Sequence, residues 1–157
     1  MSLFEVFRSM QKSSFLPVIR ELARTYQAFT HYSAAHVREL GLTPPQFDVI
    51  CTLGNTDGMP LCRLSEKTLI TKGTLTGVLD RLEHKGLLVR IVPPENRRSF
   101  IAKLTPEGDR IFQEAFPAHG LHLEKRLGNL TSSELEEIRI SLEKLRKAFT
   151  AGHDANA

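Results

Sequence analysis

The sequence is poor in cysteine and contains no long apolar run. Only two cysteines, Cys51 and Cys62, occur among its 157 residues, which indicates reduced thiols rather than a disulfide-bonded protein. No apolar stretch approaches the ~20 residues that a membrane-spanning helix needs. No secretory-type segment opens the sequence. We therefore expect a cytoplasmic protein that makes no membrane contact.

The sequence also shows no recognisable motif of catalytic residues or of metal ligands. No nucleophile–base pair, paired carboxylates or phosphate-binding loop stands out, so we expect neither catalysis nor a cofactor. His31 and His36 are five residues apart, whereas His119 and His122 are three apart. Only the second pair could share a helical face, and a zinc site needs four converging ligands. Solvated or core histidines are therefore preferred, and metal sensing remains an alternative.

The two cysteines differ in their expected surroundings. Cys51 falls on the inward face of a helical segment, which predicts a small core residue. Cys62 lies beside Arg63 near the start of another segment. Because a neighbouring cation favours a reactive thiol, a redox-sensing role for Cys62 stays open.

What the sequence does contain is an ordinary soluble composition with an uneven charge distribution. Hydrophobic residues make up 41% and charged residues 25%, as in folded globular proteins. Between positions 63 and 103 there are nine Lys or Arg and four acidic residues, so this segment has a net charge of +5. The whole chain has a net charge of +3, so the residues outside the segment sum to −2. The positive charge is concentrated on one segment, which favours a nucleic-acid partner.

That segment has the pattern of a DNA-reading helix followed by a basic hairpin. Within residues 71–86 the apolar side chains recur on one helical face, at Leu75, Val78, Leu79 and Leu82. Gly86 is placed to end this helix. Residues 87–91 and 99–104 then predict two strands around a polar tip at 93–98. The combination predicts a winged helix-turn-helix.

Helices are expected on both sides of this lobe. One should run from Phe15 to Leu40 and end at Gly41, and another should start at Thr43. Residues 61–68 should form the first helix of the helix-turn-helix pair. A helix after Thr105 should bend at Pro117, and the last should begin with a capping box at Thr131.

We therefore predict a mainly α (α+β) fold with four parts. Residues 1–40 and 109–150 should form dimerisation helices, 41–108 the winged helix-turn-helix lobe, and 151–157 a flexible tail. The outer helices carry apolar stripes that a second copy would cover, which favours a homodimer. A monomeric helical bundle is the alternative.

The candidate DNA-contacting residues lie at the start of the predicted recognition helix and at the hairpin tip. They are Thr71, Lys72, Thr74, Thr76 and Arg81 on the helix, and Arg97 and Arg98 on the hairpin. Simpler roles remain open for some of them: Thr71 as a plain N-cap, Thr76 as a packing residue, and Arg81 as the partner of Asp80 or Glu83.

Four segments resemble the multiple-antibiotic-resistance regulator (MarR) family of bacterial transcription factors. They are Leu42–Phe47, Thr71–Leu87, Glu95–Arg98 and Leu104–Gly108, in family-like order and spacing. The resemblance implies a homodimeric winged-helix protein on a pseudo-palindromic operator. Most often such a protein is a repressor released by a small ligand or an oxidant.

The resemblance also implies that Arg98 enters the minor groove. Asn96 stands where the family usually has Asp, so it can hold the wing arginine only by a neutral hydrogen bond. Leu69 replaces a small residue that is common in the turn between the paired helices.

A small-molecule pocket is expected near Tyr32, His36, Arg38 and Phe47. Apolar walls with one cationic group suit an aromatic carboxylate. Two functions compete: a DNA-binding regulator with such an effector, and a winged-helix adaptor that docks on another protein. The local charge favours the regulator.

Overall fold

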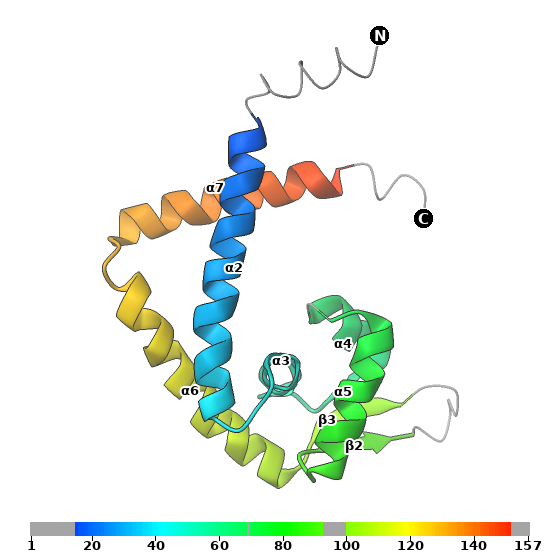
Figure 1. Ribbon diagram of the computed structural model, residues 1–157. Coiled ribbons are helices and arrows are strands. Elements are labelled where there is room, and N and C mark those ends of the chain that lie inside the picture. Colours follow the sequence, from blue (N-terminus) through cyan, green and yellow to red (C-terminus); the bar gives the residue numbers. More distant parts are fainter. Residues whose placement is uncertain (1–14, 69, 93–99, 152–157) are drawn as a thin grey trace. The chain divides into compact units, whose positions relative to one another are not determined.

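A computed structural model of the protein describes residues 15–68, 70–92 and 100–151 (Figure 1). The helices are α2 (Phe15–Glu39), α3 (Pro44–Leu53), α4 (Leu61–Lys67), α5 (Lys72–His84), α6 (Pro106–Leu127) and α7 (Ser132–Thr150). The strands are β1 (Met59–Pro60), β2 (Leu88–Ile91) and β3 (Ile101–Leu104). The expected mainly helical, winged-helix architecture is confirmed.

The chain forms two compact units, the first ending at His119 and the second beginning at Gly120. The first contains α2 to α5, the sheet and α6 up to His119. The second contains the rest of α6 and α7. The four-part division expected from the sequence remains a prediction.

The core of the first unit lies between α3, α5 and the sheet. The four apolar residues predicted for α5, Leu75, Val78, Leu79 and Leu82, are each 0% exposed. Ile50 and Leu53 of α3 meet them. The predicted inward face of the recognition helix is thus confirmed.

Local signals set the helix ends. The Thr43 amide donates to the Gln46 side-chain oxygen over 3.0 Å at the start of α3, which is half of a capping box. At the end of α5, Gly86 adopts φ 71°, a conformation that costs a side-chain-bearing residue energy. The Gly86 and Leu87 amides there donate back to Glu83 and Leu82 over 2.9 and 3.0 Å.

The sheet is antiparallel, with strand order β1-β3-β2. The β2–β3 hairpin pairs Leu88 with Leu104 and Ile91 with Ile101, which confirms the predicted wing strands. Strand β1, whose Met59 pairs with Ala102, was not predicted from the sequence. Two residues are too few to show an alternating pattern.

The outer helices begin where the sequence predicts. The Glu134 amide donates to the Thr131 hydroxyl at the start of α7, and the Glu134 carboxylate accepts from the Thr131 amide over 2.7 Å. Helix α6 continues through Pro117 as one element, and the bend expected at this proline stays a prediction.

Candidate nucleic-acid interface

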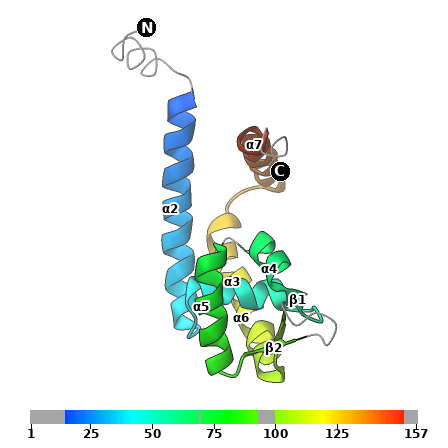
Figure 2. The same ribbon diagram turned by 90° about the vertical axis from the view of Figure 1, so that its right-hand side faces the viewer.

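The N-terminal part of α5 presents a polar, exposed side. Thr71 occupies the N-cap position, and its hydroxyl donates to the Thr74 hydroxyl over 3.1 Å. Lys72, Thr74 and Thr76 are exposed. Because the opposite face of α5 is buried, these groups project away from the lobe. Figure 2 shows α5 running along the front of the lobe, with β1 and β2 to its right.

The exposure decides between some of the alternatives for these residues. Thr76 is exposed, so it does not pack against the preceding helix. The Thr71 side chain makes no capping hydrogen bond to the backbone and is instead paired with Thr74. The hydroxyl and ammonium groups at this helix end are the types that contact phosphates and base edges.

A basic residue that the sequence analysis did not single out ties the wing to the recognition helix. Arg90 on β2 forms an ion pair with Asp80, and its Nη1 lies 3.7 Å from Glu83 Oε2. Its guanidinium carbon also lies 5.2 Å from the centre of the Phe100 ring. The Arg90 side chain is only 22% exposed. We conclude that Arg90 aligns β2 with α5 rather than facing outward.

This arrangement also answers the question about Arg81. Both carboxylates considered as its partners, Asp80 and Glu83, pair with Arg90 instead, and Arg81 is exposed. The signal for the Arg90 pairing is topological: the chain reverses at Gly86, so β2 returns along the last turns of α5.

Several sequence-derived candidates lie outside the described residues. They are the wing-tip residues Arg97 and Arg98, the neighbouring Asn96, and Leu69 in the turn between α4 and α5.

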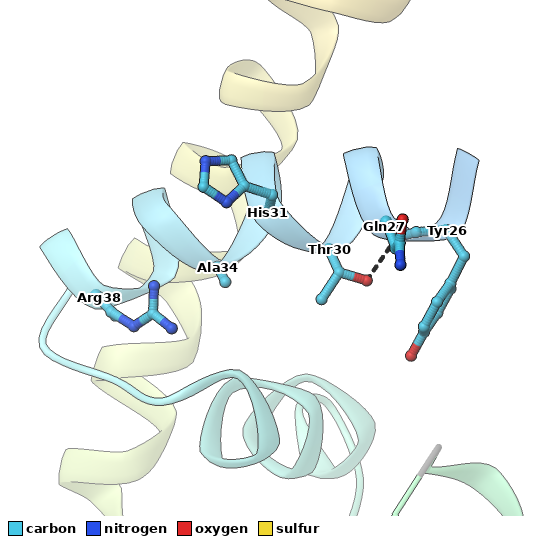
Figure 3. A pocket seen from close by; sticks show the side chains of 6 residues that line it. All are labelled: Tyr26, Gln27, Thr30, His31, Ala34 and Arg38. Carbon is cyan, nitrogen blue, oxygen red and sulfur yellow. Dashed lines mark hydrogen bonds between the residues drawn. The ribbon is translucent and has the colours of Figure 1, made fainter. Parts of the chain in front are cut away.

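A depression of about 350 Å³ lies along one side of α2 (Figure 3). It is lined by Tyr26, Gln27, Thr30, His31, Ala34 and Arg38. Figure 3 shows Tyr26, Thr30 and Arg38 pointing to the side of α2 on which α3 lies. The walls of the depression combine an aromatic ring, hydroxyl and amide groups, and one guanidinium.

Of the four residues expected to line a pocket, Arg38 lines this depression. The grouping of all four in one pocket stays a prediction. His36 and Phe47 instead pack around His119 of α6, with the Phe47 and His119 ring centres 4.8 Å apart. Since residues on a helix are ~100° apart, Tyr32 points away from Thr30 and so away from the depression.

The cysteines behave differently from each other. Burial, with a further contribution from Asp48, raises the pKa of Cys51 to about 12, so this thiol stays protonated at neutral pH. Cys62 is exposed. In residues 15–68, 70–92 and 100–151, no three His, Cys, Asp or Glu side chains gather in a way that could hold a metal ion.

Comparison with known proteins decides the family. The MarR family profile matches residues 42–100. The chain is 31% identical over 115 residues to the HTH-type transcriptional regulator MhqR of Bacillus subtilis, covering 73% of this chain and 79% of MhqR. The chain belongs to the MarR family. It is a MarR-family transcriptional regulator with the winged-helix fold of that family.

Solved structures of other MarR-type proteins agree with this fold. A structure of Bordetella bronchiseptica BpsR, from work on regulation of its DNA binding by 6-hydroxynicotinic acid, matches with TM-score 0.76 and 28% identity over 85% of this chain and 96% of that one. A mutant of E. coli MarR in complex with operator DNA matches with TM-score 0.75 and 25% identity, over 85% and 99%.

The members of the family named above are transcriptional regulators. Within the described ranges, no helix combines the length and the apolar character that crossing a bilayer would require.

Proposed function

We propose that this MarR-family protein is a homodimeric repressor that binds a pseudo-palindromic operator and is released by a small molecule. The observation that supports DNA binding most strongly is the two-sided nature of α5. Its apolar residues are fully buried, whereas Lys72, Thr74 and Thr76 are exposed together at its N-terminal end. This is the arrangement of a recognition helix that enters the major groove.

In this proposal the interface residues have distinct roles. Thr71, Thr74 and Thr76 contact base edges or phosphates, and Lys72 neutralises a phosphate. Arg81, further along the exposed side of α5, contacts the backbone. Arg97 and Arg98 of the wing enter the flanking minor groove.

The homodimer is supported by apolar side chains that the single chain leaves uncovered. No residue of α7 is buried, although its apolar residues follow helical spacing at Leu135, Ile138, Leu142, Leu145 and Phe149. The N-terminal half of α2 likewise exposes Phe15 and Val18, at 53% and 48%. A second copy would remove these surfaces from water.

The effector site is proposed at the depression on α2. Arg38 supplies a cation and Tyr26 an aromatic wall, which suits a small aromatic carboxylate. A panel of such acids should weaken operator binding, and Arg38→Gln should raise the concentration required at least tenfold. An equal response of parent and variant would remove Arg38 from the site. If no acid in the panel has an effect, a carboxylate effector is wrong.

Selection of bound fragments from genomic DNA, followed by sequencing, tests the function itself. We expect an enriched pseudo-palindrome with half-site centres ~10 base pairs apart, one turn of the duplex. Lys72→Ala, carried through the same selection, should enrich the motif less strongly. Failure of the parent protein to enrich any symmetric motif, or binding that does not weaken with salt, would favour the protein–protein adaptor instead.

A further inference from the structure

A buried histidine joins three helices of the first unit and has no part in the function proposed above. His119 on α6 is 6% exposed. Its Nδ1 lies 3.1 Å from Nδ1 of His36 on α2, and its Nε2 lies 3.1 Å from the Ser33 hydroxyl. The Phe47 ring of α3 meets it edge to face, with ring centres 4.8 Å apart. Both ring nitrogens of His119 are therefore engaged.

The geometry of the two imidazoles is that of a hydrogen bond between ring nitrogens. The ring centres of His36 and His119 are 5.3 Å apart and the planes differ by 27°. This separation is close to the 3.1 Å between the Nδ1 atoms plus the distance from each nitrogen to its own ring centre. Both nitrogens thus lie near the line joining the rings, where the N–H bond and the lone pair point. One imidazole donates and the other accepts.

Such a pair accepts a first added proton more easily than a second. If His119 takes the first proton, it donates from Nδ1 to His36 and from Nε2 to Ser33, so both of these hydrogen bonds are kept. A second proton, on His36, places two N–H groups face to face at 3.1 Å and two positive charges side by side, one of them buried. The second protonation therefore requires the contact to break.

We propose that His36 and His119 form a proton-sensitive connection between α2 and α6 that opens when both imidazoles are protonated. Because Phe47 packs on His119, opening also loosens the contact of α3 with the other two helices. Since α3 belongs to the core that supports α5, acidification then lowers the stability of the lobe. This inference needs neither an operator nor an effector, so its failure would leave the proposed function unaffected.

Other titratable groups on the same helices must be separated from the pair. Within one turn of His36, α2 carries Tyr32, Arg38 and Glu39, and α6 carries His122 one turn after His119. Asp48, next to Phe47, is the charged residue of α3. Asp48→Asn tests whether a carboxylate is responsible for any pH effect.

Nuclear magnetic resonance of the histidine Cε1–H groups between pH 8 and 4.5 tests the coupling. We expect His36 and His119 to titrate in two steps at least about one pH unit apart. In His36→Asn the amide occupies the Nδ1 position but takes no proton, so His119 should titrate in a single step. The proposal is wrong if His36 and His119 of the parent both titrate in a single step with the same midpoint, and the parent alone is enough to show this.

Thermal unfolding at pH 7.5 and 5.0 gives the consequence for stability. The folded pair binds fewer protons than two histidines of the unfolded chain, so stability falls as pH falls. The parent Tm should drop by about 3 °C more than that of His36→Asn. His84→Gln and Asp48→Asn should behave as the parent. An equal drop in parent and His36→Asn, or loss of the effect in Asp48→Asn, would overturn the proposal.

Discussion

Gly108 is placed where the structure tolerates no side chain, and its replacement gives a quantitative test of the lobe. A Cβ on Gly108 would lie 2.0 Å from the Leu87 carbonyl oxygen and 3.3 Å from Leu104 Cβ. The same oxygen accepts a hydrogen bond from the Thr105 amide over 3.1 Å, so it cannot simply rotate away. Gly108→Ala must therefore separate the start of α6 from the start of β2.

The expected cost follows from the severity of this overlap. Overpacking costs roughly 1–3 kcal/mol, and a clash with backbone belongs at the upper end. At about 2–4 °C per kcal/mol for a chain of this size, Gly108→Ala should lower Tm by roughly 6–12 °C. Circular dichroism at 222 nm, at one fixed protein concentration, measures the change.

Gly120 provides a control on the same helix. Nothing lies within 4 Å of a Cβ added there, so Gly120→Ala should gain up to about 1 kcal/mol of helix propensity and raise Tm by about 2–4 °C. A Gly108→Ala protein that melts within about 2 °C of the parent would refute the packing argument. So would a fall of similar size in Gly120→Ala.

Three further predictions concern other parts of the chain. Iodoacetamide at pH 7.5 should label the exposed Cys62 and leave Cys51 unlabelled until the protein is denatured. The reason is that the Cys51 pKa of about 12 keeps its thiol protonated. Equal rates of labelling of the two cysteines, measured by mass spectrometry, would contradict this. Leu142→Asp should dissociate or unfold the proposed dimer, because it places an unpaired charge in the interface, whereas Ser141→Asp should leave the dimer intact. If the parent protein is a monomer in analytical ultracentrifugation, the proposed dimer is wrong. Hydrogen bonds at the α7 N-cap lower the pKa of Glu134 in the folded protein. The ionised carboxylate therefore stabilises the fold above about pH 4.3, and this stabilisation is lost as the pH falls through the lowered pKa of the folded state. Between pH 6 and pH 3 the Tm of Glu134→Gln should therefore fall by less than the Tm of the parent.

The recognition helix and its neighbours could be predicted because their signals are local. The apolar spacing of α5, Gly86 at its end and the capping boxes each depend on residues within a few positions of one another. The structure agrees with them because the buried face they define is also the face that the tertiary core requires.

What could not be predicted depends on residues far apart in the chain. The two-residue β1 has no periodicity of its own and exists because β3 offers it an edge. The ion pair of Arg90 with Asp80 depends on the reversal at Gly86, and the contact of His36 with His119 joins residues 83 positions apart.

The central claim is that α5 carries the DNA-binding surface, and the salt dependence of operator affinity tests it most directly. Fluorescence anisotropy on the selected operator, over a series of salt concentrations, should show weaker binding for Lys72→Ala and a slope of log K against log salt reduced by about 1. Lys144→Ala removes an equal charge from an exposed position on α7 and should match the parent in both quantities. If Lys72→Ala and Lys144→Ala give the same affinity and slope as the parent, α5 does not contact DNA as described.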